Sequence, residues 1–183
     1  MQTMVSIQTY ESPIGTLLLA ADEVGLCGLW LSGEKQFADN LPAEHVWQST
    51  PVLAKAQQWL DIYFSAKEPD FMPPLHPVGS AFRQAVWQQL LQIPYGKTVT
   101  YGQIAQKLAK QRGIPRMSAQ AVGGAVGHNK ISIIIPCHRV VGAGGNLTGY
   151  AGGIDRKIKL LELEGVDLRG LYVPKKGNSI VTG

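Results

Sequence analysis

The sequence contains few cysteines, few charged residues and no long apolar run. Its 183 residues include two cysteines, Cys27 and Cys137, which are too few for a disulfide framework, and neither has a second cysteine nearby to complete a CxxC metal site. A reducing compartment is therefore the simpler expectation. The longest apolar runs, residues 15–21 and 131–136, are far shorter than the roughly 20 residues that cross a bilayer, and the N-terminus has no signal-peptide pattern. We expect a cytoplasmic protein with no membrane partner.

The composition predicts a folded chain. Charged residues make up 16% of it, below the roughly 25% of an average globular domain, whereas hydrophobic residues make up an ordinary 45%. A disordered chain would combine low hydrophobicity with high net charge, so this composition excludes disorder. The length fits one large domain or two small ones, because single domains contain roughly 100–200 residues.

Charge is divided unevenly along the chain. Residues 1–77 carry three lysines and nine acidic residues, whereas residues 78–183 carry fourteen Lys or Arg and four acidic residues. This asymmetry predicts that the C-terminal part binds a polyanion and that the N-terminal part does not. The alternative is a solvated basic face that has no partner.

The N-terminal part predicts a small antiparallel sheet with one helix. Residues 4–10, 15–21 and 26–31 have the pattern of short strands, separated by turn residues. Residues 51–66 place apolar side chains at helical spacing, so this helix should pack one face on the sheet.

A proline-rich stretch predicts the domain boundary. Four prolines between residues 69 and 77 exclude both a helix and a central strand there. We interpret this stretch as an interdomain linker, which gives an N-terminal domain at 1–77, a C-terminal domain at 78–165 and a tail at 166–183.

Beyond the linker the apolar spacing becomes helical. Ser80 can cap a first helix that ends before Pro94, and Thr100 can cap a second helix over residues 101–109. A third helix, rich in small residues, is predicted between residues 115 and 126. Two short helices joined by a turn are typical of a helix-turn-helix.

The remaining sequence predicts a strand, a loop and a last helix. An apolar, β-rich run at 131–135 precedes a glycine-rich loop at 142–153. A helix follows over residues 154–164 and is stopped by Gly165. The tail after Gly165 has no motif, and we expect it to be disordered.

Cys137 is the candidate for chemistry. Pro136 fixes the backbone before it, and His138 and Arg139 supply polar and positive groups that favour thiolate over thiol, whose unperturbed pKa is about 8.5. Because the preceding strand is apolar, the thiol should emerge where a buried segment reaches a polar pocket. These neighbours indicate a nucleophile; the alternative is a small, buried, apolar side chain.

Several segments, taken in order, match one known family. They are residues 82–87, 95–105 with their TYGQIA core, 121–125, IPCHRV at 135–140, GYAGG at 149–153 and KLLELEG at 159–165, together with Asn129. The chain thereby resembles the O6-alkylguanine-DNA alkyltransferases, also called methylated-DNA–protein-cysteine methyltransferases. The resemblance implies an α+β protein with a small ribonuclease H-like α/β domain followed by a helical winged-helix domain that contains the helix-turn-helix.

The resemblance also implies a reaction. An alkyl group moves from O6 of guanine, and from O4 of thymine, in duplex DNA to the protein's own cysteine after the base is flipped. The nucleophile corresponds to Cys137, the base that acts through a water to His138, and the glutamate that orients this base to Glu164. Because the thioether formed is a poor leaving group, we expect each molecule to act once and to need no cofactor.

Further residues take roles from the same resemblance. Tyr101 is the implied donor to the departing guanine, which gains negative charge as the bond breaks. Asn129 is implied to brace the turn that carries the active site, and Tyr150 to close over the flipped base. Val140 and Ala151 are expected to line the base pocket.

The DNA-binding helix departs from the family pattern. Relatives usually have arginine in the string ARAVGG, whereas this chain has SAQAVGG, so that Gln120 occupies the position of the arginine that replaces the flipped nucleotide. Glutamine can fill that space, but it brings no cation. Ala119, Ala121 and Gly123 are implied to approach the minor groove, and Arg116 is the candidate source of the missing charge.

We expect a monomer that binds double-stranded DNA containing O6-alkylguanine, with clustering on DNA left open. No metal is expected, because Cys27 lies in an apolar strand and His45 and His76 lie in loop-like sequence. Two alternatives remain. A non-enzymatic sensor of alkyl lesions would lack Cys137, and a cysteine hydrolase would draw its nucleophile and base from separated segments.

Overall fold

The computed structural model describes residues 4–176 and 179–180, and its contacts divide the chain into two units. The first unit is Met1–Val78 together with Lys130–Ile134, and the second is Gly79–Asn129 together with Ile135–Gly183. The chain therefore returns to the first unit just before it reaches Cys137. No sequence signal predicts this return.

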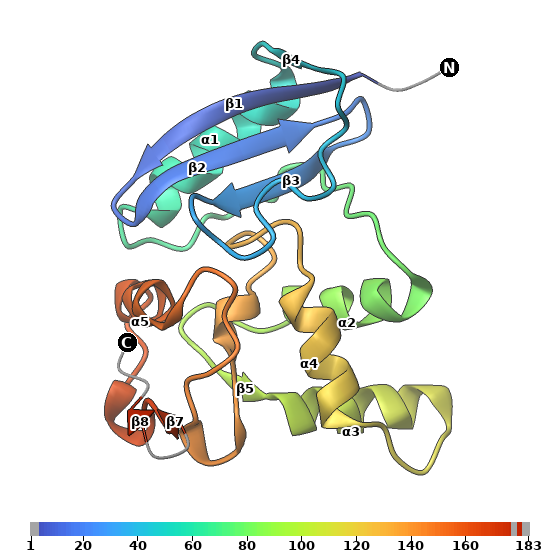
Figure 1. Cartoon of the computed structure of the whole chain (residues 1–183), viewed down its shortest axis with the longest axis vertical. Helices are drawn as coiled ribbons and strands as arrows, with labels where there is room; N and C mark the ends of the chain where they lie inside the picture. Colours follow the sequence, from blue (N-terminus) through green and yellow to red (C-terminus); the bar gives the residue numbers. More distant parts are fainter. Residues whose placement is uncertain (1–3, 177–178, 181–183) are drawn as a thin grey trace. The chain divides into compact units, whose positions relative to one another are not determined.

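The first unit is built on a four-stranded sheet in the order β3-β2-β1-β4 (Figure 1). The strands β1 (Val5–Ser12), β2 (Gly15–Ala21) and β3 (Leu26–Leu31) pair antiparallel, as predicted, and β4 (His45–Trp47) pairs with β1 in parallel. The expectation that His45 lies in a loop is wrong. A strand of three residues is too short to show a hydrophobic period, so the sequence does not reveal it.

Both faces of this sheet are covered. Helix α1 (Pro51–Tyr63) begins after Thr50, whose hydroxyl accepts a hydrogen bond from the backbone N–H of Leu53, and it packs against one face (Figure 1). On the sheet, one cluster of buried side chains comprises Val5, Ile7, Leu18, Ala20, Cys27 and Trp30, with Ala38 and Leu41 packed against it. Cys27 is thus a core residue, as predicted.

Two segments run beside β3 and pair with its backbone. Leu75 of the proline-rich stretch forms a parallel bridge with Leu26, and Ile131 forms one with Leu29. The backbone N–H of Leu29 donates to the carbonyl of Lys130 at 2.8 Å, so residues 130–134 are fixed to the first unit by hydrogen bonds as well as by burial.

The strand predicted at residues 131–135 is wrong. Ile131 alone makes a strand-like bridge, and the chain then turns through Ile133, whose φ is +70°. The backbone N–H of Ile134 bonds to the carbonyl of Ser132 at 2.8 Å within this turn. The apolar composition of the run reflects complete burial rather than an extended backbone.

Three helices form the body of the second unit: α2 (Ala81–Leu91), α3 (Tyr101–Arg112) and α4 (Ala119–Gly127). Their N-caps are Ser80, Thr100 and Ser118, each of which accepts a backbone hydrogen bond. All three helices are predicted from the sequence. Helix α3 runs beyond the predicted end at residue 109 and stops at Gly113, whose φ of +65° suits glycine.

The rest of the second unit includes the segment that carries Cys137. A parallel pair joins β5 (Val99–Thr100) to β6 (Val140–Val141), and the short 3-10 helix η1 (Cys137–Arg139) directly precedes β6. The glycine-rich loop contains the 3-10 turn η2 (Ala143–Gly145), and helix α5 (Ile154–Leu163) follows it. The chain then forms η3 (Leu168–Gly170), β7 (Lys175–Lys176) and β8 (Ser179–Ile180).

The expectation of a disordered tail is wrong for its first residues. Val166, Leu168, Leu171 and Val173 pack against a buried cluster of Val141, Leu147 and Leu161. This apolar spacing is too irregular for a helix or a strand, so only the packed structure reveals it. Residues 177–178 and 181–183 of the predicted tail lie outside the described residues. Within the part of the chain that the structure describes, no helix has the length and hydropathy of a membrane span.

Candidate active site and nucleic-acid interface

Cys137 is the first residue of η1 and is almost fully buried, with 7% of its surface exposed. The turn before it is held by two hydrogen bonds to one acceptor. The backbone N–H of Cys137 and the side-chain amide of Asn129 both donate to the carbonyl of Ile135 at 2.8 Å. Asn129 therefore lies where it can fix the backbone that carries the thiol.

His138 and Glu164 form a buried pair beside this thiol. Nε2 of His138 lies 2.6 Å from Oε2 of Glu164, and neither side chain is exposed. Arg139 donates from Nε to Oε1 of Glu164 at 2.8 Å and from Nη2 to Oε2 at 3.2 Å. The backbone N–H of Gly96 donates to Oε1 at 3.0 Å, so the carboxylate accepts hydrogen bonds on both oxygens.

These contacts set the charges of the pair. Burial opposes ionisation of Glu164, but the hydrogen bond to His138 and then the hydrogen bonds and charge of Arg139 outweigh it and lower the pKa of Glu164 to about 2. Burial lowers the pKa of His138, and its hydrogen bond to Glu164 only partly offsets this effect. At neutral pH Glu164 is therefore a carboxylate, and His138 is a neutral imidazole able to accept a proton.

Two tyrosines belong to this site. Tyr101 begins α3, and its hydroxyl donates to the carbonyl of Thr148 at 3.4 Å. Burial, and then the negative charge of Cys137, raise the pKa of Tyr101 to about 12, so the hydroxyl stays protonated and can donate. Tyr150 is buried, and its ring stands edge-on to the imidazole of His138 with centroids 6.5 Å apart.

Gly149 directly precedes Tyr150 and leaves room for the hydroxyl of Tyr101. Its φ is +80°, and a Cβ atom at this position would lie 2.8 Å from the hydroxyl oxygen of Tyr101. The sequence marks Gly149 only as part of the GYAGG motif and predicts no separate role for it. Of the two other predicted pocket residues, Val140 is fully buried in β6 and Ala151 is partly exposed.

Lys157 is a further residue of this site, and sequence reasoning missed it. Its side chain is fully buried in α5, and its ammonium donates to the carbonyls of Val140 and Thr148 at 2.6 and 3.0 Å. The negative charge of Cys137 acts on this ammonium. Its position on the apolar face of the last predicted helix is the one signal that could have found it.

Helix α4 presents an exposed face of small residues. Ala119, Gln120 and Ala121 are exposed on its first turn, and Arg116 is exposed in the preceding loop. On the inner side, Gly123 lies close to the ring of Tyr101. The predicted DNA-binding residues are thus at the surface, and one of them contacts a predicted site residue.

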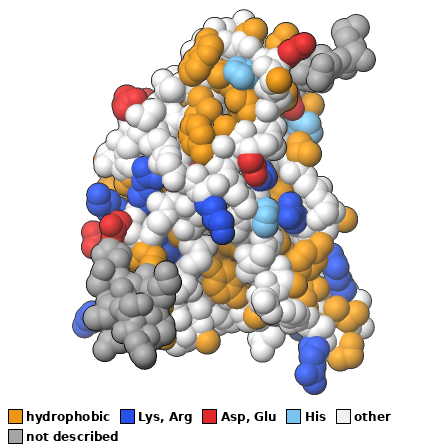
Figure 2. All heavy atoms as spheres, viewed as in Figure 1, with side chains coloured by type: hydrophobic (Ala, Val, Ile, Leu, Met, Phe, Trp, Pro, Cys, Tyr) orange, Lys and Arg blue, Asp and Glu red, His pale blue; other side chains and the backbone are white. Residues whose placement is uncertain are grey.

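Exposed basic side chains lie on α3 and in the loop that precedes α4. Lys107, Lys110 and Arg112 are exposed on α3, in addition to Arg116, and Figure 2 shows Lys and Arg side chains on the surface of this unit. A hollow of about 490 Å³ lies between α3 and the loop before α4, and Lys110 and Arg116 help to line it. Such a surface is suited to the phosphates of a nucleic acid.

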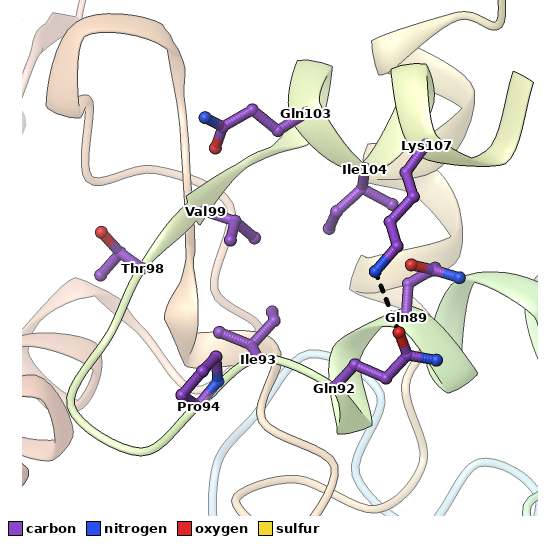
Figure 3. Close-up of a pocket in the computed structure, with 9 residues that line it drawn as sticks. All are labelled: Gln89, Gln92, Ile93, Pro94, Thr98, Val99, Gln103, Ile104 and Lys107. Carbon is purple, nitrogen blue, oxygen red and sulfur yellow. Dashed lines mark hydrogen bonds between the residues drawn. The ribbon is translucent and has the colours of Figure 1, made fainter. Parts of the chain in front are cut away.

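A separate cavity of about 300 Å³ lies where α2, β5 and α3 meet (Figure 3). Its lining includes the amides of Gln89, Gln92 and Gln103, and the ammonium of Lys107 donates to Gln92 at 3.0 Å. Neither a thiol nor an imidazole lines it, so it is not the site of the chemistry described above. Among the described residues, no three His, Cys, Asp or Glu side chains are grouped to hold a metal ion.

Comparisons with known proteins define the class. Residues 5–77 match the family model of the 6-O-methylguanine DNA methyltransferase ribonuclease-like domain, and residues 81–166 match the model of the 6-O-methylguanine DNA methyltransferase DNA binding domain. Together with the two-domain fold, these matches identify a DNA alkyltransferase. The chain belongs to the 6-O-methylguanine DNA methyltransferase family, and its function is DNA repair by alkyl transfer.

Relatives match over most of the chain. A methylated-DNA–protein-cysteine methyltransferase of Methanosarcina barkeri is 45% identical over 160 residues, covering 87% of this chain and 96% of the relative. The crystal structure of Mycobacterium tuberculosis OGT in complex with DNA is 43% identical with a TM-score of 0.74, covering 87% of this chain and 92% of that one. An O6-methylguanine DNA methyltransferase from Methanococcus jannaschii is 30% identical with a TM-score of 0.60, covering 97% of this chain and 99% of that one. The family and the two-domain α+β fold predicted from the sequence are confirmed.

Proposed function

We propose that the protein removes the alkyl group of O6-alkylguanine in duplex DNA by transferring it to Sγ of Cys137, once per molecule. The observation that carries this proposal is the buried pair of His138 and Glu164, with 2.6 Å between their nearest atoms, whose histidine directly follows Cys137 in the sequence. A nucleophile, a neutral base and an ionised group that orients the base are the components that activate a thiol.

The transfer step follows from these components. The proton of the Cys137 thiol passes through a water to His138, and the carboxylate of Glu164 stabilises the imidazolium that forms. Sγ attacks the alkyl carbon in line, the S–C bond forms, and the C–O6 bond breaks with its electron pair passing to guanine. The hydroxyl of Tyr101 donates a hydrogen bond to the ring as this charge develops, and a proton from solvent completes the neutral guanine.

Helix α4 is proposed to bind the DNA through the minor groove. The exposed small residues Ala119 and Ala121 allow close approach, and Gln120 fills the space left by the flipped nucleotide. The ring of Tyr150 closes over the extruded base, and Val140 and Ala151 line its pocket. Asn129 holds the turn that carries the thiol.

The proposal includes action as a monomer in the cytoplasm, with O4-alkylthymine as a second substrate. One thiol and one base pocket in one chain are sufficient for the chemistry described. Neither alternative function is favoured, because curated relatives with 45% and 42% identity carry the name methylated-DNA–protein-cysteine methyltransferase. A lesion sensor would release the alkylated DNA unchanged, and a cysteine hydrolase would release a cleaved product.

Mass spectrometry of the protein's peptides tests the nucleophile. After incubation with duplex DNA that contains O6-methylguanine, the Cys137 peptide should gain the mass of one CH2 unit, because a methyl group replaces the thiol hydrogen, in an amount equal to the guanine restored. Cys137→Ser should abolish transfer and keep DNA binding. Cys27→Ala is the matched control, because burial raises the pKa of Cys27 to about 11 and leaves it unreactive. Loss of methylated guanine in the presence of Cys137→Ser would contradict the assignment.

A further inference from the structure

The cavity where α2, β5 and α3 meet has no part in the proposed transfer. Its volume of about 300 Å³ is at the lower end of the roughly 300–1,000 Å³ that is typical of small-molecule pockets. Figure 3 shows that the side chains of Ile93, Val99 and Ile104 point toward one another across this space. Together they form an apolar surface that suits the body of a small ligand.

Lys107 brings a positive charge to this cavity. Among the described residues that line the cavity, no other side chain is charged. The ammonium of Lys107 donates one of its three N–H bonds to Oε1 of Gln92 at 3.0 Å, and an amide oxygen satisfies this donor without neutralising the charge. The cavity therefore has a positive end and, within its described lining, no negative group.

The amide of Gln89 faces the same ammonium. Gln89 is 7% exposed, and its Nε2 donates to Oε1 of Gln111 at 3.3 Å. This contact directs the amide oxygen of Gln89 toward the ammonium of Lys107 (Figure 3). The amide oxygens of Gln89 and Gln92 thus both favour a position of the cation at the cavity. A cation that is already in place loses less entropy when a ligand binds it.

Two walls of the cavity also contact the buried site. Ile93 lines the cavity with its side chain, and its backbone carbonyl accepts a hydrogen bond from Nη1 of Arg139 at 2.8 Å. Val99 lines the cavity from β5, where it pairs with Val140, the residue that follows η1. A ligand in the cavity therefore touches residues that are in direct contact with the segment around the thiol.

We propose that this cavity is a second ligand site, which binds a small carboxylate with a ring-shaped or branched apolar body. The carboxylate pairs with Lys107, and the body packs on the apolar surface. One ammonium neutralises the single charge of a carboxylate, whereas a phosphate monoester carries about −1.5 to −2 at pH 7 and would keep unpaired charge. Because the ligand contacts Ile93, Arg139 senses its binding. This inference is independent of the proposed role of Cys137, since no step of the transfer uses the cavity.

Titration of the full-length protein with sodium benzoate tests the inference. In two-dimensional NMR spectra, benzoate should shift the backbone signals of Ile93, Val99 and Ile104 in a saturable manner. It should bind more tightly than acetate, which lacks the ring, than benzyl alcohol, which lacks the charge, and than phenyl phosphate, which carries a higher charge. Absence of saturable shifts, or benzoate binding no tighter than that of benzyl alcohol, would overturn the inference. Tighter binding of phenyl phosphate would overturn the assignment of a carboxylate.

Lys107→Gln removes the charge and keeps an N–H donor. It should weaken benzoate binding about fivefold or more, while benzyl alcohol binds as it does to the parent. Lys110→Gln is the matched control, because Lys110 is exposed on the same helix and lies outside this cavity. Equal benzoate affinity in the parent and in Lys107→Gln would overturn the inference. A loss in Lys110→Gln alone would also overturn it, since the anion would then occupy the hollow before α4.

The side chain of Arg139 gives a second readout. Its Nε–H group donates to Glu164 at 2.8 Å, and its Nη1 donates to Ile93 of the cavity wall. Benzoate should therefore shift the Nε–H signal of Arg139 in the parent and, at the same concentration, shift it less in Lys107→Gln. An Arg139 signal that stays fixed while the cavity signals saturate would overturn the link to the buried site. The proposed function would survive all these results, because it fails on a different observation, loss of methylated guanine in the presence of Cys137→Ser.

Discussion

Gly123 of α4 lies against the ring of Tyr101: a Cβ atom at position 123 would be 3.7 Å from Cδ1 of the tyrosine. Gly123 belongs to the helix proposed to enter the minor groove, and Tyr101 carries a hydroxyl whose pKa responds to Cys137. Tyr101 therefore lies against the helix that we propose binds DNA, and its hydroxyl is within electrostatic range of the thiol that we propose reacts.

His138 and Glu164 should act as one unit in catalysis. Each of His138→Gln and Glu164→Gln should slow single-turnover repair by about 10²–10³, because the thiol loses its base or the base loses its orientation. The double variant should be little slower than the worse single variant. Rates from rapid-quench assays provide the comparison, with the exposed Glu162→Gln as control. Losses that multiply in the double variant would argue against a relay.

The buried Glu164 should also contribute to acid stability. Its pKa is about 2 in the folded protein and 4.5 without perturbation, so its contribution is fully present above pH 4.5 and disappears as the pH falls towards 2. The difference in pKa corresponds to about 3 kcal/mol. Urea unfolding from pH 7 to pH 3 should show the parent and Glu164→Gln converging in free energy of unfolding at acid pH. A constant difference across this range would mean that Glu164 is not ionised in the fold.

Gly149→Ala should impair repair more than it impairs folding. Its Cβ would crowd the hydroxyl of Tyr101 at 2.8 Å and displace the proposed donor, whereas a non-glycine residue at positive φ costs only about 1 kcal/mol. Gly144→Ala is the matched control, because Gly144 has a φ of +73° in the same loop and open space around it. We expect similar unfolding temperatures and at least a tenfold slower repair for Gly149→Ala alone. Equal repair rates in the two variants would remove the role of the Tyr101 contact.

Gln120→Arg should strengthen repair of duplex DNA. A guanidinium in the minor groove is attracted by phosphates and stacks on bases, which corresponds to a gain of about two- to fivefold in affinity. The gain should appear in binding and single-turnover assays with duplex DNA and should vanish with free O6-benzylguanine, which needs no flipping. An equal gain with the free base would place residue 120 at the chemical step. A slower arginine variant on duplex DNA would indicate that the inserted residue lies elsewhere, with Arg116 the next candidate.

The elements of the fold follow from local sequence signals where those signals are strong. The caps Ser80 and Thr100 and the strands β2 and β3 lie where the pattern predicts them, because capping residues and apolar periods act over a few neighbouring positions. The apolar run at 131–135 misled the prediction, since a turn that is buried on every side has the composition of a strand.

The site is less accessible to sequence reasoning. The motif around Cys137 indicates that this residue is the nucleophile. The contacts of Lys157, in contrast, are made to backbone carbonyl groups, which every residue possesses and which no sequence pattern marks. The role of Gly149 depends in the same way on a tyrosine 48 positions earlier in the chain. Such contacts arise from the folded backbone and appear only when the structure is known.

The return of residues 130–134 to the first unit has a consequence for how this gene can be divided. A cut after Val78 would leave Leu29 without its hydrogen-bond partners, and the downstream fragment would carry Ile131, Ile133 and Ile134 away from the environment that buries them. Such fragments should aggregate when made separately and recover only when they are produced together. A chimaera that joins the first part of one family member to the second part of another would therefore have to take residues 130–134 from the same member as β3.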